Sequence, residues 1–213
     1  MRVLSVNVGM PNQVPVNHGT VVTSIFKSPV EGRVTVRRHN IDGDRQSDLT
    51  VHGGPNKAVY CYPGEHYRYW KEQLPERDLP YGVFGENLTT EGITEEAVLI
   101  GDRFRVGSAV LQVTQPRMPC FKLGIRFGLS SMVKRFWQSG RSGIYFSVVE
   151  EGDVAAGDSM EKIASGPEEI SVADVVRLYR GDETSEELLA RALRAPLSGS
   201  WKEELRERAL RGV

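Results

Sequence analysis

Cysteine and histidine are scarce in this 213-residue sequence, which has only Cys61 and Cys120 and four histidines. Two cysteines cannot build a disulfide framework, and with four scattered histidines they show no zinc-ligand spacing. Long apolar runs are also absent, so no segment is long enough for a membrane span, and the first residues are too short and too alternating for a secretion signal. We therefore expect a cytoplasmic protein without a structural zinc and without membrane association.

The sequence also lacks an excess of charge of either sign, because 27 Lys and Arg face 28 Asp and Glu. Such a balance gives no general attraction to nucleic acid or to anionic lipid, so any anion site must come from a local group of cations. The phosphate loop of nucleotide hydrolases is missing too, since the tandem glycines Gly53 and Gly54 are followed by Pro-Asn-Lys. Neither a nucleic-acid partner nor nucleotide hydrolysis is expected.

What the chain does contain is many short β-branched or alternating runs separated by glycine and proline. Strands are predicted at residues 3–8, 20–26, 32–38, 58–62, 97–106, 109–113 and 142–150, and helices at 65–74, 121–127 and 130–138. Many short strands with glycine turns and few long helices are typical of a mostly β fold, here a closed or nearly closed β-barrel with peripheral helices.

The composition changes near residue 166, after which three helix starts follow one another. Each has a capping residue three positions before an acid, namely Ser171 with Asp174, Thr184 with Glu187 and Ser200 with Glu203. We expect a barrel domain at residues 1–165 and a three-helix domain at residues 166–213. Acidic residues outnumber basic ones in the helical part, which argues against DNA binding and favours docking on the barrel or on a partner subunit, as in a homodimer.

Cys120 follows a predicted strand that Pro116 and Pro119 bring to an end, with Arg117 and Lys122 on either side. A nearby positive charge favours the thiolate, the form that attacks or binds metal. Free cysteine is also among the most buried residue types, so a small packing residue in a loop is the alternative. This segment alone does not separate the two, whereas Cys61, inside a predicted strand, is expected to pack.

Two loops could contact a ligand. Tandem glycines let backbone amides approach an anion, here between His52 and Lys57, although an isolated pair is more typical of an ordinary turn. In the glycine-punctuated segment 82–92, Glu86 and Asn87 could orient a ligand or bond the local backbone.

Taken together, four segments resemble the MOSC domain family in order and spacing, and the helical region places the resemblance with its YiiM-type members. These segments are residues 43–48, 52–59, 82–89 and 117–122. The resemblance implies a β-barrel that binds molybdenum cofactor (Mo-molybdopterin), a pterin dithiolene with a phosphate, and a catalytic Cys120 that ligates the metal. It also implies reduction of N-hydroxylated small molecules, including hydroxylaminopurine base analogues. The electrons are expected from a separate reductase, because the chain has no flavin, haem or iron–sulfur motif.

The pterin phosphate needs cations and free amides, and the sequence offers a set of candidates for these roles. They are Lys27, Arg45, His52, Gly53, Gly54, Lys57, Arg117 and Lys122, of which Lys27, His52, Lys57 and Arg117 are preferred. Asp48 and Asn87 are expected to hold pterin ring amides or to orient the cations. Two alternatives stay open: a sulfur carrier with a persulfide on Cys120, and a non-catalytic carrier of the pterin cofactor.

Overall fold

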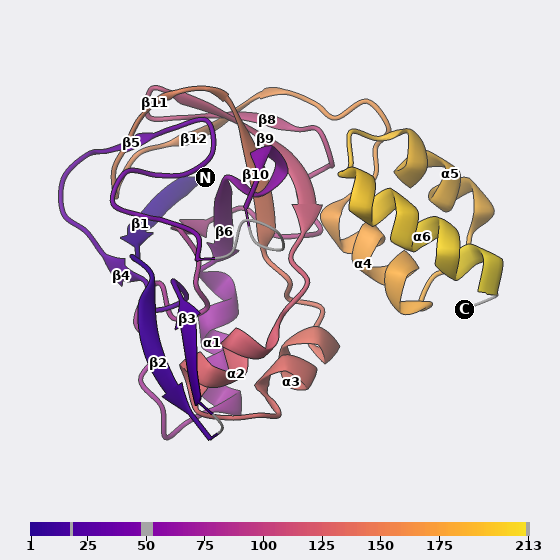
Figure 1. Cartoon of the computed structure of the whole chain (residues 1–213). Helices are drawn as coiled ribbons and strands as arrows, with labels where there is room; N and C mark the ends of the chain where they lie inside the picture. Colours follow the sequence, from indigo (N-terminus) through magenta and orange to yellow (C-terminus); the bar gives the residue numbers. More distant parts are fainter. Residues whose placement is uncertain (18, 48–52, 212–213) are drawn as a thin grey trace.

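The structure of the chain is a computed structural model that describes residues 1–17, 19–47 and 53–211. A β-sheet forms the centre of the molecule, helices α1 to α3 lie together at one end of it, and α4 to α6 form a separate group at its side (Figure 1). The mostly β architecture with peripheral helices and a C-terminal helical domain agrees with the prediction.

The central sheet has eight strands and brings distant parts of the chain side by side. Their spatial order is β12 (Met160–Ala164), β8 (Arg103–Val106), β9 (Ala109–Pro116), β10 (Ile144–Glu150), β6 (Val59–Pro63), β7 (Leu88–Glu91), β1 (Arg2–Val8) and β4 (Ser28–Pro29). Neighbours are antiparallel except β6 and β7, which run parallel. Two small sheets pair β2 (Asn12–Val16) with β3 (Gly19–Thr23), and β5 (Val34–Val36) with β11 (Gly152–Val154).

The two ends of the large sheet lie close to each other, although β12 and β4 are its edge strands in the described part of the chain. The Val3 N–H donates to the Asp158 carbonyl (2.9 Å) and the Met160 N–H donates to the Met1 carbonyl (3.0 Å). These bonds join the start of β1 to the segment that leads into β12. Closure into a complete barrel stays a prediction.

The strand predicted to begin at residue 97 is wrong, because residues 95–97 and 100–101 lie in turns, Leu99 forms an isolated bridge with Ser171, and β8 begins at Arg103. Asp102 explains the difference. Its fully buried carboxylate accepts from the backbone N–H groups of Leu99 (2.9 Å) and Gly166 (2.8 Å) and pairs with Lys162 (2.8 Å). Such side-chain to backbone bonds favour a turn over a strand, and a hydropathy pattern does not reveal them.

Two groups of buried apolar side chains support the sheet. Inside the sheet, Phe104 and Phe146 pack edge to face with ring centroids 6.2 Å apart, and Cys61 on β6 is fully buried beside the same core. Burial raises the pKa of the Cys61 thiol, consistent with the packing role expected for it. Below the sheet, α1 (Glu65–Gln73) buries Trp70, which stacks on Phe136 of α3 (Met132–Gln138).

The C-terminal helices are α4 (Val172–Arg180), α5 (Glu186–Arg194) and α6 (Gly199–Arg211), so three helices form as predicted. Ser171 and Asp174 make the predicted capping box. The other two caps are displaced: Ser185, rather than Thr184, accepts from the Leu188 N–H, and Ser200 lies inside α6. Adjacent hydroxyl residues offer alternative caps, and the sequence alone does not choose between them.

The three-helix group packs directly on the rest of the molecule. The Tyr179 ring of α4 lies edge-on to Trp137 of α3 (5.4 Å) and contacts Trp201 of α6 (5.2 Å). Arg180 donates to the carbonyls of Trp137 (3.3 Å) and Gln138 (3.2 Å). These contacts fix α6 next to the loop that carries Cys120.

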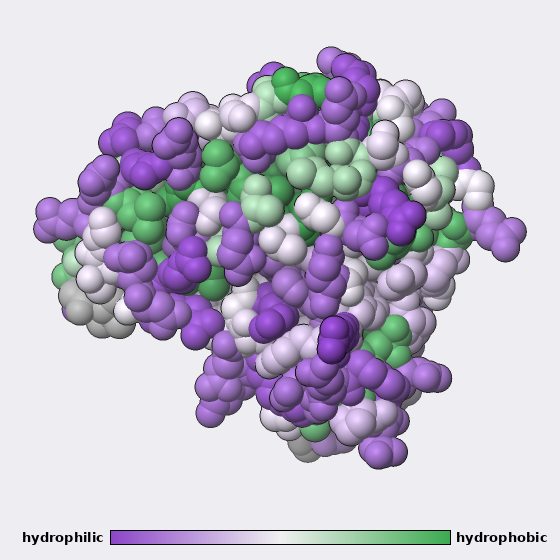
Figure 2. Space-filling view, turned by 180° about the vertical axis from the view of Figure 1, so that it is seen from behind, coloured by the Kyte–Doolittle hydropathy of each residue, from purple (hydrophilic) through white to green (hydrophobic). Residues whose placement is uncertain are grey.

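On the reverse face of the molecule, hydrophilic side chains dominate and hydrophobic ones emerge between them in small groups (Figure 2). Among the helices that the structure describes, none combines the length and the apolar character needed to cross a membrane.

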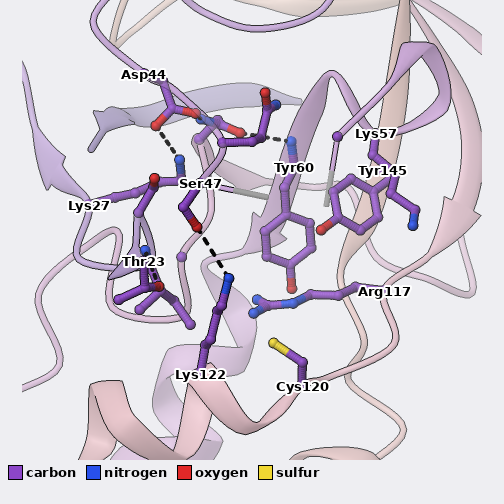
Figure 3. A pocket seen from close by; sticks show the side chains of 16 residues that line it. Thr23, Lys27, Asp44, Ser47, Lys57, Tyr60, Arg117, Cys120, Lys122 and Tyr145 are labelled. Atoms are coloured by element: carbon purple, nitrogen blue, oxygen red, sulfur yellow. Dashed lines mark hydrogen bonds and ion pairs between the residues drawn. The ribbon is translucent and has the colours of Figure 1, made fainter. Parts of the chain in front are cut away.

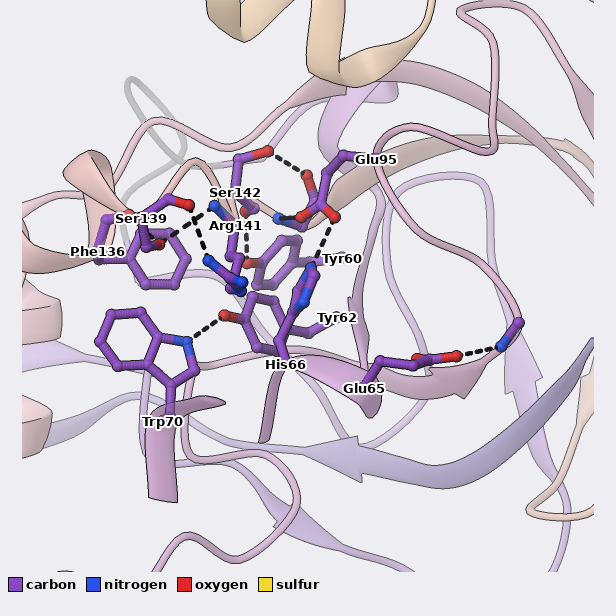
Figure 4. Close-up of polar contacts among 12 residues, drawn as sticks. Tyr60, Tyr62, Glu65, His66, Trp70, Glu95, Phe136, Ser139, Arg141 and Ser142 are labelled. Carbon is purple, nitrogen blue, oxygen red and sulfur yellow. Dashed lines mark hydrogen bonds and ion pairs between the residues drawn. The ribbon is translucent and has the colours of Figure 1, made fainter. Parts of the chain in front are cut away.

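A buried polar network connects α1 to the strand that follows α3 (Figure 4). The Glu95 carboxylate is 1% exposed, contacts His66 Nε2 at 2.7 Å and accepts from the Gly143 N–H at 2.6 Å. Nearby, the Trp70 indole N–H donates to the Tyr62 hydroxyl (2.6 Å). The carboxylate thus satisfies two buried groups that would otherwise lose their bonds to water.

We expect Glu95→Ala to lower the free energy of unfolding by about 2–3 kcal/mol, because two buried polar groups lose their partner. Urea unfolding measures the change. Glu65→Ala is the matched control, since that exposed carboxylate also accepts a backbone N–H, from Gly92 at 2.6 Å, yet water replaces it. Equal effects of the two substitutions would show that burial of the Glu95 network does not stabilise the fold.

Candidate functional site

Cys120 lies in the connection between the central sheet and the helices. β9 runs to Pro116, three residues beyond the predicted strand end, and Cys120 is the N-cap residue of α2 (Phe121–Phe127). The thiol is half-buried and lines a pocket, with its sulfur pointing toward the Arg117 guanidinium (Figure 3). The cysteine is therefore reachable from solvent and is not sealed in the apolar core.

This pocket, which we call the cation pocket, collects most of the predicted site residues from four separate segments of the chain. Its walls include Lys27, Gly53, Lys57, Asn87, Arg117, Cys120 and Lys122. Two candidates lie elsewhere: Arg45 is exposed and Gly54 does not line the pocket. Asp48 and His52 fall outside the described residues.

Lys27 is held in the pocket wall by a buried ion pair with Asp44. The two residues are 8% and 4% exposed, and Asp44 also accepts from the Gly9 N–H and from Asn87 Nδ2, both at 2.9 Å. Burial lowers the pKa of Lys27, and the neighbouring Asp44 carboxylate opposes this shift only in part. Asp44 thus fixes the position of an ammonium group that would be costly to bury alone.

Asn87 supports this ion pair and uses its whole side-chain amide to do so. Its Oδ1 accepts from the Tyr60 N–H (3.1 Å) while its Nδ2 donates to Asp44. Asn87 therefore acts on Lys27 through Asp44, and its expected role toward the pterin stays a prediction.

Arg117 is fixed from the opposite side by the glycine-punctuated loop. Its Nη1 donates to the Phe84 carbonyl, and its guanidinium carbon lies 4.7 Å from the centroid of the Tyr60 ring. Burial lowers the pKa of Arg117, but Tyr60, Tyr145 and Cys120 outweigh it and the pKa is raised overall. Arg117 therefore stays charged next to the thiol.

The loop itself is held by a buried carboxylate and by glycine. Glu86 is fully buried and accepts from the N–H groups of Gly82 (2.8 Å) and Phe84 (3.1 Å). Gly85 has φ of 81°, and a Cβ there would lie 2.9 Å from Ile25 Cγ1. Glu86 therefore bonds the local backbone, one of the two roles left open for it, and the loop builds the part of the pocket wall that positions Arg117.

Further polar groups complete the pocket near Cys120. Lys57 ends the short 3-10 helix η1 (Pro55–Lys57), and burial lowers its pKa. Lys122 donates to the Ser47 hydroxyl (3.2 Å), and the Ser24 hydroxyl in the wall is buried without a partner in the described part of the chain.

Tyr145 packs on Tyr60 with ring centroids 4.9 Å apart. Burial raises the pKa of Tyr145, so its hydroxyl stays a proton donor.

Several of these residues were not predicted. Asp44 lies in the segment 43–48 that suggested the family, but no pattern in that segment favours it over Asp48. Ser24, Ser47, Tyr60 and Tyr145 resemble ordinary loop or strand residues. Only the pairing of β10 with β6 and β9 brings the two tyrosines beside Cys120.

A cationic pocket of this kind predicts a pH-dependent affinity for sulfate, an anion whose charge is constant above neutral pH. Folding lowers the pKa values of Lys27 and Lys57 below the ordinary 10.5, so both lose their protons, and their attraction for sulfate, at lower pH than free lysine. We expect sulfate binding to weaken about tenfold or more as the pH rises through this window, because one bond to a charged group contributes about 1.5–3 kcal/mol. Calorimetric titration measures it.

The control for this prediction is arginine, which keeps its proton throughout. Lys57→Arg is expected to flatten the pH profile, whereas Lys71→Arg, an exposed position on α1, leaves it unchanged. A wild-type affinity that does not fall with rising pH would contradict the assignment of these lysines to an anion site.

Known protein families and a solved structure resemble this chain over most of its length. The family model described as "MOSC domain" matches residues 48–161, and the model described as "YiiM-like, 3-alpha helix domain" matches residues 170–209. The crystal structure of YiiM from Geobacillus stearothermophilus superposes with a TM-score of 0.81 at 33% identity, covering 98% of both chains.

Two sequence relatives are informative. The Bacillus subtilis protein YflK is 45% identical over 201 residues, which cover 94% of this chain and 90% of YflK. A Gibberella moniliformis protein named "Reductase" is 34% identical over 193 residues, which cover 89% of this chain but only 34% of that protein. Most of the second relative therefore lies outside the region that the two share.

Proposed function

Since this chain belongs to the MOSC domain family and ends in a YiiM-like three-helix domain, we propose that it is a molybdenum-cofactor-dependent reductase of N-hydroxylated small molecules. The observation that carries the proposal is the position of Cys120. A reachable thiol faces the same pocket as Lys27, Lys57, Arg117 and Lys122. Purine base analogues with an N-hydroxyl group are the substrates we expect.

The residues present suit a pterin dithiolene that carries a phosphate. Cations surround the pocket, and the unpartnered Ser24 hydroxyl adds a polar group in its wall. Among the described residues, no group of three or more His, Cys, Asp or Glu gathers to hold a metal. A dithiolene supplies two sulfur ligands itself, so the protein needs to supply only one soft thiolate, which would be that of Cys120.

In this proposal each side chain has a distinct role. Cys120 would hold the metal, while Lys27, Lys57 and Lys122 would hold the phosphate and Arg117 would favour the thiolate. When bound, the cofactor supplies two electrons, which with two protons convert an N–OH group into N–H and water. The protonated Tyr145 hydroxyl can donate a hydrogen bond to the departing oxygen, since it lines the wall beside Cys120.

We further propose that the sheet forms the family's β-barrel domain over residues 1–165, with the three-helix domain over residues 166–213. The bonds that join β1 to the segment before β12 support this division. The electrons would come from a separate reductase. In support, the relative named "Reductase" carries additional chain over most of its length, beyond the part shared with this protein.

The test is to make the protein in cells with an intact cofactor pathway and to quantify molybdenum and pterin. The same preparation is assayed for reduction of 6-N-hydroxylaminopurine with reduced methyl viologen, which replaces the unknown electron donor. We expect one molybdenum per chain and release of adenine. Pterin without turnover would identify a cofactor carrier, and a cyanide-labile sulfur on Cys120 without molybdenum would identify a sulfur carrier; either outcome would overturn the reductase proposal.

A further inference from the structure

We propose that a second pocket, between Cys120 and the three-helix domain, binds the amino-substituted ring of the substrate. This interface pocket has a volume of about 220 Å³. Lys57, Cys120 and Tyr145 line both this pocket and the cation pocket, so the two meet at the thiol. The inference rests on the proposed function, because it assigns the substrate to one side of Cys120 and the cofactor to the other.

The interface pocket has two hydrogen-bond acceptors in its wall, on Gln115 and Glu204, and one lysine, whereas three lysines and an arginine line the cation pocket. Gln115 on β9 is 2% exposed and lines it, and the Gln115 Oε1 has no hydrogen-bond partner in the described part of the chain. Glu204 on α6 also lines the pocket; like Glu203 it is exposed, and it makes no ion pair with a described residue, so the buried unpaired acceptor is that of Gln115. A buried unpaired acceptor is costly, and a ligand that donates an N–H group removes that cost.

The remaining walls favour a flat and largely apolar ligand. Trp201 of α6 is 5% exposed and is fixed by its contact with Tyr179. The volume is below the roughly 300 Å³ at which sites for drug-sized ligands begin, so one or two rings are the appropriate size. Acceptors at the rim and aromatic walls together select an amino-substituted heteroaromatic ring. Glu204 and Trp201 would then be specificity residues that only the three-helix domain supplies.

Binding of a product analogue with a second amino group tests this without turnover or metal. We titrate the full-length protein with 2,6-diaminopurine and with unsubstituted purine by calorimetry. We expect 2,6-diaminopurine to bind more tightly, and Glu204→Ala to weaken it about tenfold, as for loss of one bond to a charged group, with little effect on purine. Gln115→Leu should act in the same direction. Glu203→Ala is the matched control, because Glu203 is exposed on the same helix but does not line the pocket.

Equal affinities for the two purines, or an unchanged affinity in Glu204→Ala, would overturn the inference. Displacement of 2,6-diaminopurine by sulfate would also overturn it, because sulfate is expected in the cation pocket. Failures of the two proposals are distinguishable. Normal molybdenum content and turnover without selective diaminopurine binding refutes only the interface pocket, whereas selective binding in a protein that never acquires molybdenum refutes only the proposed reductase.

Discussion

Cys120→Ala is expected to lose molybdenum and to reduce hydroxylaminopurine at least about a thousandfold more slowly, as when a group that takes part directly in the chemistry is removed. The pterin is expected to stay bound, because in the proposed site its phosphate would be held by Lys27, Lys57 and Lys122, which line the pocket and which the substitution leaves in place. Metal analysis, pterin fluorescence after release and the viologen-coupled assay measure the three quantities on one preparation.

Two further variants separate the thiolate from a general effect of losing a cysteine. Cys61→Ala removes the other thiol, which is fully buried in β6, and is expected to lower stability without changing molybdenum content. Cys120→Ser keeps the shape but replaces the soft ligand by a hard one, so molybdenum content should fall here as well. Full reductase activity in Cys120→Ala would remove the metal-ligand role and with it the proposed mechanism.

The sequence predicted the fold best where one local signal acted alone. The loop after β9 was recognisable from Pro116 and Pro119, and the first C-terminal helix from Ser171 and Asp174. Prediction from the sequence failed where hydrogen bonds to a buried polar side chain determine the backbone conformation. Asp102 holds residues 97–100 out of a strand through a bond from the nearby Leu99 N–H and a second bond from the Gly166 N–H, 64 residues away, and no local pattern encodes the second bond.

The candidate site shows the same limit. Lys27, Arg117 and Cys120 could be selected by chemistry and resemblance, and the structure brings them to one pocket. Asp44 could not, because its importance depends on facing Lys27, which comes from a different segment. Trp201 follows Ser200 in the third predicted C-terminal helix with nothing in the sequence to mark it as a site residue, and packing of α6 on the Cys120 loop makes it part of a pocket wall.

Asp44→Ala is expected to lower the free energy of unfolding by about 3–5 kcal/mol, the usual cost of removing one partner of a buried ion pair. It leaves the buried Lys27 ammonium uncompensated, and the Gly9 N–H and Asn87 Nδ2 each lose an acceptor. Asp42→Ala is the matched control. That carboxylate pairs with Arg37 at 2.9 Å but is half exposed, so its removal should cost less than about 1 kcal/mol.

The pH dependence of this variant identifies Lys27 as the cause. Burial already lowers the pKa of Lys27, and removal of the Asp44 carboxylate lowers it further. Between this lowered pKa and the ordinary value of 10.5, Lys27 is protonated in the unfolded chain but not in the folded chain. The variant widens this pH range. Stability then rises with pH across that range, and the deficit relative to wild type shrinks as the solution becomes alkaline. Urea unfolding at neutral and alkaline pH measures it. Lys27→Met in the Asp44→Ala background should restore part of the free energy of unfolding and abolish this pH dependence. If the double variant is as unstable as Asp44→Ala alone, the lost stability comes from the bonds to Gly9 and Asn87 instead.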